Sequence, residues 1–275
     1  MQDADPQPRP AVLVLGMHRS GTSALTRVLS LHGLALPARL VGARSDNPRG
    51  FWESAEVAAL NDRILAAMGS SYGDPRPLPR GLLPPERLEG FITEAAELLG
   101  AEFPGEAPFV LKDPRICRLL GIWLPALVRF GTAPLALIPV RNPLEVARSL
   151  ERREAMPKRR ALLLWLSHVL AAERDSRALP RAVAHYDDLL RDWRGYLARL
   201  GAPVRPEATP ATDAFLTPAL RHHEATTDML LRDAEVPAQV KRLYAELRRA
   251  PGESGLEPEP FATAAAWLEA QRDFG

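Results

Sequence analysis

Residues 11–23 read AVLVLGMHRSGTS, and this stretch indicates both the fold and the kind of ligand. The first five residues form an unbroken apolar run, which is typical of a strand buried on both faces. A loop follows that begins at Gly16 and has a second glycine five residues later, at Gly21. After it, apolar residues three or four apart predict a helix that ends at Gly33. A strand, a glycine-bounded loop and a helix in this order direct backbone N–H groups toward an anion. A strand-to-helix turn without a ligand is the simpler alternative.

The loop departs from the nucleotide-binding pattern G-x-x-x-x-G-K-[ST] at one position. Thr22 stands where that pattern has lysine, while Ser23 keeps the hydroxyl position. ATP-hydrolysing sites use the lysine on the β- and γ-phosphates, so its absence weakens the interpretation as an ATP site. A cation lies instead inside the loop, at Arg19. With the hydroxyls of Ser20, Thr22 and Ser23 around it, this cation favours an anion-binding loop over an empty turn.

Cations also follow the next two predicted strands. Phe109–Leu111 precedes Lys112, and Pro134–Val140 precedes Arg141. Ser149 lies eight residues after Arg141, about two turns into the next predicted helix. Ligands usually bind beyond the carboxyl ends of parallel strands, so these residues are candidates for a second anion site. Taken alone, an Arg-x7-Ser spacing is also compatible with a solvated helix serine.

Strands and helices alternate along the rest of the chain. The helix after Arg141 has a clear start signal: Asn142 as the N-cap, Pro143 at the first helical position and Glu145 at the third. Further helices are expected over 54–68, 86–100, 116–129, 160–178, 188–200, 237–249 and 261–272, a strand over 182–186, and irregular structure over 34–53, 73–85 and 202–224. The alternation predicts an α/β protein with a mostly parallel sheet and helices on both faces. Together with the loop of residues 16–23, this order resembles the P-loop type of fold. Residues 1–9 are expected to be a disordered tail, and residues 10–275 a single domain.

Composition excludes several classes of partner. The formal net charge is +1, so there is no whole-protein field to attract nucleic acid or an anionic membrane. Cys117 is the single cysteine, which rules out an intramolecular disulfide and favours a reducing compartment. The N-terminus lacks the basic and apolar regions of a signal peptide, and no apolar run approaches the ~20 residues that span a bilayer. We expect a cytoplasmic protein without a transmembrane segment.

The run Arg19-Ser20-Gly21-Thr22 resembles the 5'-phosphosulfate-binding loop of sulfotransferases that use 3'-phosphoadenosine 5'-phosphosulfate (PAPS). The match is to the arginine form found in carbohydrate and tyrosyl-protein sulfotransferases. The resemblance implies that Arg19, Ser20, Gly21, Thr22 and Ser23 bind the 5'-phosphate and the sulfuryl group.

Two further segments extend the resemblance. Arg141 through Ser149 (RNPLEVARS) resembles the segment that holds the 3'-phosphate of PAPS, with Arg141 and Ser149 as its ligands. Lys112-Asp113-Pro114 resembles the Lys-Asp-Pro of tyrosyl-protein sulfotransferases. Residues 185–190 resemble the end of a core strand and the segment that follows it in the same superfamily. The resemblance covers residues 11–200. The C-terminal Arg-Lys-Gly segment of the cytosolic enzymes is not visible.

A general base is needed to take the proton of an acceptor hydroxyl. No histidine follows Lys112, where the cytosolic enzymes have one, so the resemblance to tyrosyl-protein and carbohydrate enzymes points to Glu53. Asp113 and His18 are the alternatives, and a helix-start glutamate on the surface is the non-catalytic interpretation of Glu53. Arg19 and Lys112 are the candidates for stabilising charge on the leaving group.

The predicted activity is sulfuryl transfer from PAPS to a hydroxyl of a carbohydrate, glycolipid or other small acceptor, with release of adenosine 3',5'-bisphosphate (PAP). No metal is expected. The alternatives are a P-loop kinase that uses ATP and Mg2+, and a nucleotide-binding module without catalytic activity. The sequence leaves open the identity of the acceptor and the oligomeric state.

Overall fold

A sheet of four parallel strands lies at the centre of the described part of the chain. The computed structural model describes residues 8–43, 47, 49–79, 81–201, 203–204, 210–217, 224–249, 256–271 and 273–274. The strands are β1 (Arg9–Val14), β2 (Phe109–Leu111), β3 (Thr132–Val140) and β4 (Arg181–His185). Their order is β2-β1-β3-β4, and every neighbouring pair is parallel. This arrangement confirms the predicted α/β class.

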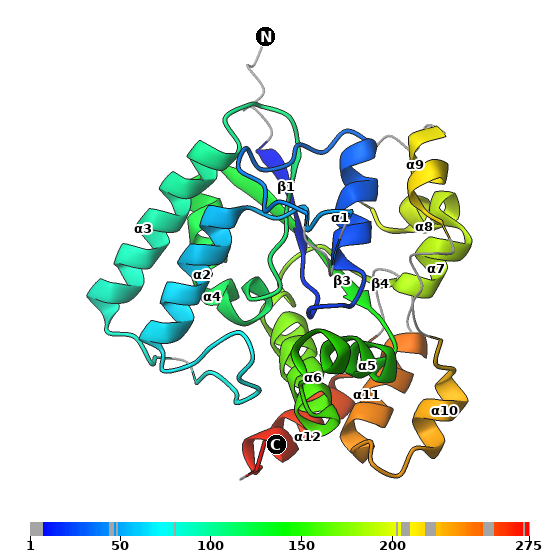
Figure 1. Cartoon of the computed structure of the whole chain (residues 1–275). Coiled ribbons are helices and arrows are strands. Elements are labelled where there is room, and N and C mark those ends of the chain that lie inside the picture. Colours follow the sequence, from blue (N-terminus) through cyan, green and yellow to red (C-terminus); the bar gives the residue numbers. More distant parts are fainter. Residues whose placement is uncertain are drawn as a thin grey trace.

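Helices cover both faces of the sheet, as Figure 1 shows for the two sides of β1. Alternate residues of a strand point to opposite faces, so Leu13 and Val12 belong to different core clusters. On the face of Leu13 lie α2 (Ala55–Ala67), α3 (Pro85–Glu102), α4 (Ile116–Arg129) and α6 (Lys158–Asp175). On the face of Val12 lie α1 (Thr22–Leu31), α7 (Tyr186–Arg191) and α8 (Trp193–Arg199). Burial on both faces explains the unbroken apolar run of β1.

The remaining helices follow β3 or lie after β4. They are α5 (Pro143–Glu154), α9 (Pro210–Phe215), α10 (Thr227–Arg232), α11 (Ala238–Arg249) and α12 (Pro258–Glu269). α11 and α12 pack on α6, where the rings of Trp165 and Tyr244 lie 6.5 Å apart between centroids. No helix within the described ranges is long and apolar enough to cross a membrane.

Two predicted helix starts are confirmed by their caps. The Ser54 side chain accepts a hydrogen bond from the Val57 backbone N–H at 3.1 Å, and α2 begins one residue later. The Asn142 side chain accepts from the Leu144 N–H at 3.0 Å and starts α5. Such side chains satisfy backbone donors that have no partner within the first turn of a helix.

Several predicted helix boundaries are wrong. α6 ends at Asp175 rather than at 178, and α12 spans Pro258–Glu269 rather than 261–272. α3 continues through Gly100, because one glycine lowers the stability of a helix by only about 1 kcal/mol relative to alanine. The residues after Gly100 are also held by a tertiary contact. There, the buried Glu102 accepts a hydrogen bond from Arg39 Nε at 2.6 Å. The helix predicted over 188–200 is instead two helices, α7 and α8. Asp192 interrupts it, since its side chain caps α8 by accepting from the Gly195 N–H at 3.0 Å.

Other differences concern segments that lack a clear periodic pattern. α9 lies within the stretch 202–224 that was predicted to be irregular, and Tyr186 begins α7 rather than ending a strand. β1 starts at Arg9, the last residue of the predicted tail, because its guanidinium donates to the carbonyls of Ala107 and Phe103 at 2.7 and 2.9 Å. Residues 1–7 of that tail lie outside the described residues.

Candidate functional site

The candidate residues gather where the strands end. The loop from Gly16 to Ser23 follows β1, Lys112 follows β2, Arg141 follows β3 and Tyr186 follows β4. Because all four strands are parallel, these positions lie along the same edge of the sheet. β1 has β2 on one side and β3 on the other, so residues after both neighbours flank the loop.

The loop depends on two glycines that contact other parts of the chain. A Cβ on Gly16 would overlap Pro139 at the end of β3 and the side chain of Thr22. Gly21 has φ +85°, and a Cβ there would overlap the ring of Tyr186. The predicted glycine spacing therefore reflects close approach of the backbone to β3 and α7.

Arg19, Arg141 and Ser149 form one group, which we term the Arg141 cluster. Arg19 Nε donates to Ser149 Oγ at 2.8 Å, across 130 residues of sequence. Arg141 Nη1 donates to the carbonyl of Arg19 at 3.2 Å. The structure thus brings the loop cation next to the two residues predicted to bind the 3'-phosphate.

The Arg141 cluster has buried donors that suit an anionic oxygen ligand. Arg141 is only 8% exposed, and its Nη2 has no hydrogen-bond partner among the residues that the structure describes. Ser20 in the loop is 1% exposed, and its Oγ also has none. Buried polar atoms in native proteins almost always have partners, so these two donors are available to a ligand bound here. Phosphate oxygens accept such bonds well, and a phosphate therefore fits this place.

Lys112, Glu53 and Ser23 form a second group, the Lys112 cluster. Lys112 Nζ donates to Glu53 Oε2 at 2.5 Å and lies 3.5 Å from Ser23 Oγ. The side chains of Lys112 and Glu53 are 1% and 13% exposed, so the ion pair is largely shielded from water. Ser23 is in the first turn of α1, which places this cluster at the loop's helix end.

The environment of Glu53 favours a proton acceptor. Burial raises the pKa of Glu53 above its ordinary value, and the positive charge of Lys112 only partly opposes this change. A carboxylate with a raised pKa binds a proton more strongly than one in water and is better matched to general base catalysis near neutral pH. This property suits the role predicted from the sequence.

A strained backbone precedes Glu53. Trp52 has φ +57°, a conformation that is uncommon for a bulky residue. The Arg27 guanidinium lies 4.4 Å from the centre of the Trp52 ring, and the buried indole Nε1 has no hydrogen-bond partner within the described ranges. Such strain persists where the surrounding structure enforces it, and it is common at functional sites. Here it accompanies the turn that carries Glu53 to Lys112.

The two alternative bases are less suited to the role. Asp113 is fully buried, and its carboxylate accepts bonds from the Arg115 backbone N–H at 2.9 Å and from Arg115 Nη1 at 2.8 Å. Both of its oxygens therefore serve to hold Arg115. Burial lowers the pKa of His18 well below its ordinary value, so the imidazole is neutral and a weak base. Its ring lies against Tyr72, at 5.5 Å between centroids, which agrees with a role in shaping the loop.

Sequence reasoning missed two residues that surround Arg141. Glu145 Oε2 accepts from Arg141 Nε at 2.6 Å, and the Tyr186 ring lies 4.9 Å from the guanidinium carbon. We had interpreted Glu145 only as a helix-start residue. Its spacing of four residues from Arg141 was the available signal, but a strand end and a helix start do not share a regular geometry that would predict the contact.

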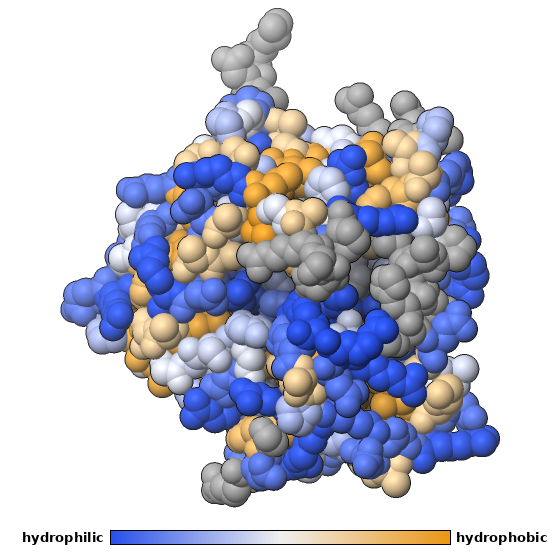
Figure 2. Space-filling view, viewed as in Figure 1, coloured by the Kyte–Doolittle hydropathy of each residue, from blue (hydrophilic) through white to orange (hydrophobic). Residues whose placement is uncertain are grey.

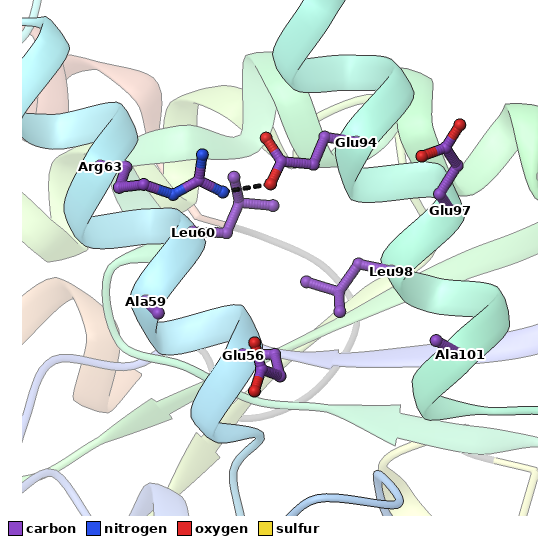
Figure 3. Close-up of a pocket in the computed structure, with 8 residues that line it drawn as sticks. All are labelled: Glu56, Ala59, Leu60, Arg63, Glu94, Glu97, Leu98 and Ala101. Carbon is purple, nitrogen blue, oxygen red and sulfur yellow. Dashed lines mark hydrogen bonds and ion pairs between the residues drawn. The ribbon is translucent and has the colours of Figure 1, made fainter.

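A separate open groove lies between α2 and α3 (Figure 3). It is lined by Glu56, Ala59, Leu60, Arg63, Glu94, Glu97, Leu98 and Ala101. Arg63 is paired with Glu94, which leaves two further carboxylates on the rim. This excess of negative charge does not suit an anionic nucleotide. Among the described residues, no group of three or more His, Cys, Asp or Glu side chains is arranged to hold a metal ion.

No model of a known protein family matches the chain, and no curated protein sequence does. Among solved structures, the sulfotransferase domain of the Synechococcus PCC 7002 olefin synthase has 18% sequence identity and a TM-score of 0.46, over 99% of each chain. The sulfotransferase domain from the curacin biosynthetic pathway has 14% identity and a TM-score of 0.41, over 98% of this chain and 99% of that one. Since identity and superposition are both low, we infer the function from the site's own residues.

Proposed function

We propose that this protein is a sulfotransferase that moves the sulfuryl group of PAPS to a hydroxyl of a carbohydrate, glycolipid or other small acceptor and releases PAP. The observation that carries the proposal is the Arg141 cluster, in which a buried guanidinium is linked to Ser149 through Arg19 and one of its nitrogens has no partner among the described residues. A 3'-phosphate would satisfy this nitrogen. ATP and ADP carry only a hydroxyl at that position.

The two clusters suit the two ends of such a substrate. PAPS supplies an activated sulfuryl group, which is displaced from the bridging oxygen of the 5'-phosphate. The loop amides and the start of α1 bind the 5'-phosphate, and Lys112 offsets the negative charge that develops on its leaving oxygen. Glu53 takes the proton of the acceptor hydroxyl as the new sulfur–oxygen bond forms. Lys112 and Glu53 are in contact. Lys112 can therefore act on the leaving oxygen while Glu53 acts on the incoming oxygen of the same displacement.

The alternative enzyme is a P-loop kinase that uses ATP and Mg2+. It is disfavoured by Thr22, which replaces the lysine of the phosphate loop, and by Lys112, which follows β2. A binding module without catalytic activity would share the nucleotide site but would have no use for the buried Lys112–Glu53 pair. Release of PAP from PAPS that depends on an added acceptor separates the enzyme from such a module.

Arg141→Ala is expected to abolish a preference for PAP over ADP. The parent protein should bind PAP at least about tenfold more tightly than ADP, since a charge-assisted hydrogen bond contributes roughly 1.5–3 kcal/mol. This preference should not require Mg2+, because Arg19, Lys112 and the loop amides neutralise the 5'-phosphate. Calorimetric titration of both nucleotides in EDTA measures it for the parent and the variant.

Arg129→Ala is the matched control for this titration. Arg129 lies at the end of α4, its side chain is 44% exposed, and it pairs with Glu89. Its loss should leave both affinities within about threefold of the parent, since surface substitutions usually have small effects. Equal affinity of the parent for PAP and ADP, or binding that appears only with Mg2+, would reject the sulfotransferase and favour the kinase.

We also propose that residues 10–275 act as one domain in a reducing, cytoplasmic environment. The proposal is supported by Cys117, the single cysteine, which is buried and unpaired. Burial raises the pKa of its thiol, so it is an unreactive core residue.

A further inference from the structure

Glu145 is a buried carboxylate that sulfuryl transfer does not directly use. It is 0% exposed and lies in the first turn of α5, four residues after Arg141. Oε2 accepts a hydrogen bond from Arg141 Nε at 2.6 Å, and Oε1 accepts one from the Ala225 backbone N–H at 2.9 Å. Each oxygen thus holds a different part of the chain, and one of these parts is the site cation.

The contacts of Arg141 restrict its guanidinium on three sides. Glu145 holds Nε, the carbonyl of Arg19 accepts from Nη1 at 3.2 Å, and the Tyr186 ring covers one face at 4.9 Å. Nη2 is the nitrogen for which the described part of the chain offers no partner. A guanidinium held in this way is fixed before a ligand arrives, so binding requires little further ordering of the side chain.

The same first turn of α5 holds the chain near residue 225. Asn142 Nδ2 donates to the carbonyls of Ala225 and Thr226 at 2.8 and 3.2 Å, next to the bond between Glu145 and the Ala225 N–H. Asn142 and Glu145 together fix this segment at the start of α10. Glu145 is therefore held by a backbone donor at the carboxylate oxygen that Arg141 does not use.

We propose that Glu145 is a positioning residue that directs Nη2 of Arg141 toward the 3'-phosphate. The proposal rests on the proposed function, because it requires a nucleotide with that phosphate. A buried ion pair is weak evidence for a role in stability, since its desolvation cost offsets much of the attraction between the charges. Its effect on the orientation of Arg141 is direct, because a planar guanidinium binds carboxylates and phosphates in defined directions.

Glu145→Gln isolates this role. The amide keeps an oxygen that can accept from the Ala225 N–H, but it removes the negative charge beside Arg141 Nε. We expect PAP affinity to fall at least about tenfold, as for loss of a charge-assisted hydrogen bond, while ADP affinity stays within about threefold of the parent. The measurement is calorimetric titration of PAP and ADP in EDTA, with thermal unfolding of each variant recorded in parallel.

Glu151→Gln on the same helix is the matched control. Glu151 is exposed, and Figure 2 shows that the surface around α5 is mostly hydrophilic. Both affinities should stay within about threefold of the parent in this variant. Glu145→Asp keeps the charge and should retain more of the preference for PAP than Glu145→Gln. It also provides the test if the glutamine variant does not fold.

The outcomes separate this proposal from the proposed function. If the parent has no preference for PAP, the proposed function is wrong and the role of Glu145 is wrong with it. If the parent has the preference and Glu145→Gln keeps it, only the role of Glu145 is rejected. A parallel fall in PAP and ADP affinity would also reject it, because that result indicates a general structural defect. If Glu145→Asp loses as much of the preference for PAP over ADP as Glu145→Gln does, the negative charge of Glu145 is not what positions Arg141.

Discussion

Glu53→Gln is expected to lower turnover by roughly 10²–10⁴, the usual contribution of a general base. The amide cannot accept the proton of the acceptor hydroxyl, although it has nearly the same shape as the carboxylate. PAP affinity should not fall, because the substitution leaves the positive charge of Lys112 in place for the 5'-phosphate. Turnover is measured as PAP released from PAPS with the most active acceptor from a panel of sugars and alcohols, and affinity by calorimetry.

The pH dependence provides a second test of the same residue. Glu53 acts as a base only when it is ionised, so turnover should fall as the pH drops through its pKa. Burial raises this pKa, and the fall should therefore begin at a higher pH than for a glutamate in water. Glu53→Gln should remove this acidic limb from the profile of the residual activity.

Glu56→Gln is the control for both experiments. Glu56 lies one turn further along, in the first turn of α2, and its side chain is 50% exposed. This variant should keep the turnover and the pH profile of the parent. If PAP affinity fell together with turnover in Glu53→Gln, the residue would be structural, and Asp113 would become the candidate despite its contacts with Arg115.

Arg19→Ala is expected to lower turnover by roughly 10²–10³, by analogy with the loss of one preorganised donor to a developing negative charge. Arg19 is the cation inside the loop, and its side chain extends to Ser149. Alanine would remove the positive charge that the loop contributes to the Arg141 cluster. The same PAP-release assay measures the effect, with saturating PAPS so that weaker binding does not contribute.

Arg63→Ala controls for the loss of an arginine elsewhere. Arg63 lies on α2 in the groove of Figure 3, and its side chain is 56% exposed. Turnover of this variant should equal that of the parent. Activity of Arg19→Ala within about threefold of the parent would rule out a role for this charge in the reaction, since the loss of a transition-state donor has a far larger effect.

The sequence by itself determined the local elements of this protein. The run AVLVL, the glycines at 16 and 21 and the periodic residues after them predicted β1, the loop and α1. Asn142 predicted the start of α5, because an N-cap acts on backbone groups only a few residues away. The candidate residues at the strand ends were also found in this way, since each lies beside a recognisable strand.

Short helices without a clear period were not predicted, because tertiary contacts stabilise them. α9 is six residues long, which is too short to be stable alone, and its Thr212 hydroxyl contacts the ring of His32, the C-cap residue of α1, at 3.1 Å. The break between α7 and α8 at Asp192 was missed for a related reason. An aspartate in a helical pattern is compatible with either a helix interior or a cap.

Only the tertiary structure decided which candidates meet. Lys112 lies 59 residues from Glu53 in sequence, and Arg19 lies 130 residues from Ser149. Their pairing follows from the strand order β2-β1-β3-β4, which no local pattern specifies. Periodicity and capping act over a few residues, whereas an ion pair depends on which strand ends are neighbours and on how much water the surrounding helices exclude. For that reason the sequence pointed to Glu53, Lys112 and Arg141 as site residues, and the fold alone paired Glu53 with Lys112 and Arg141 with Glu145.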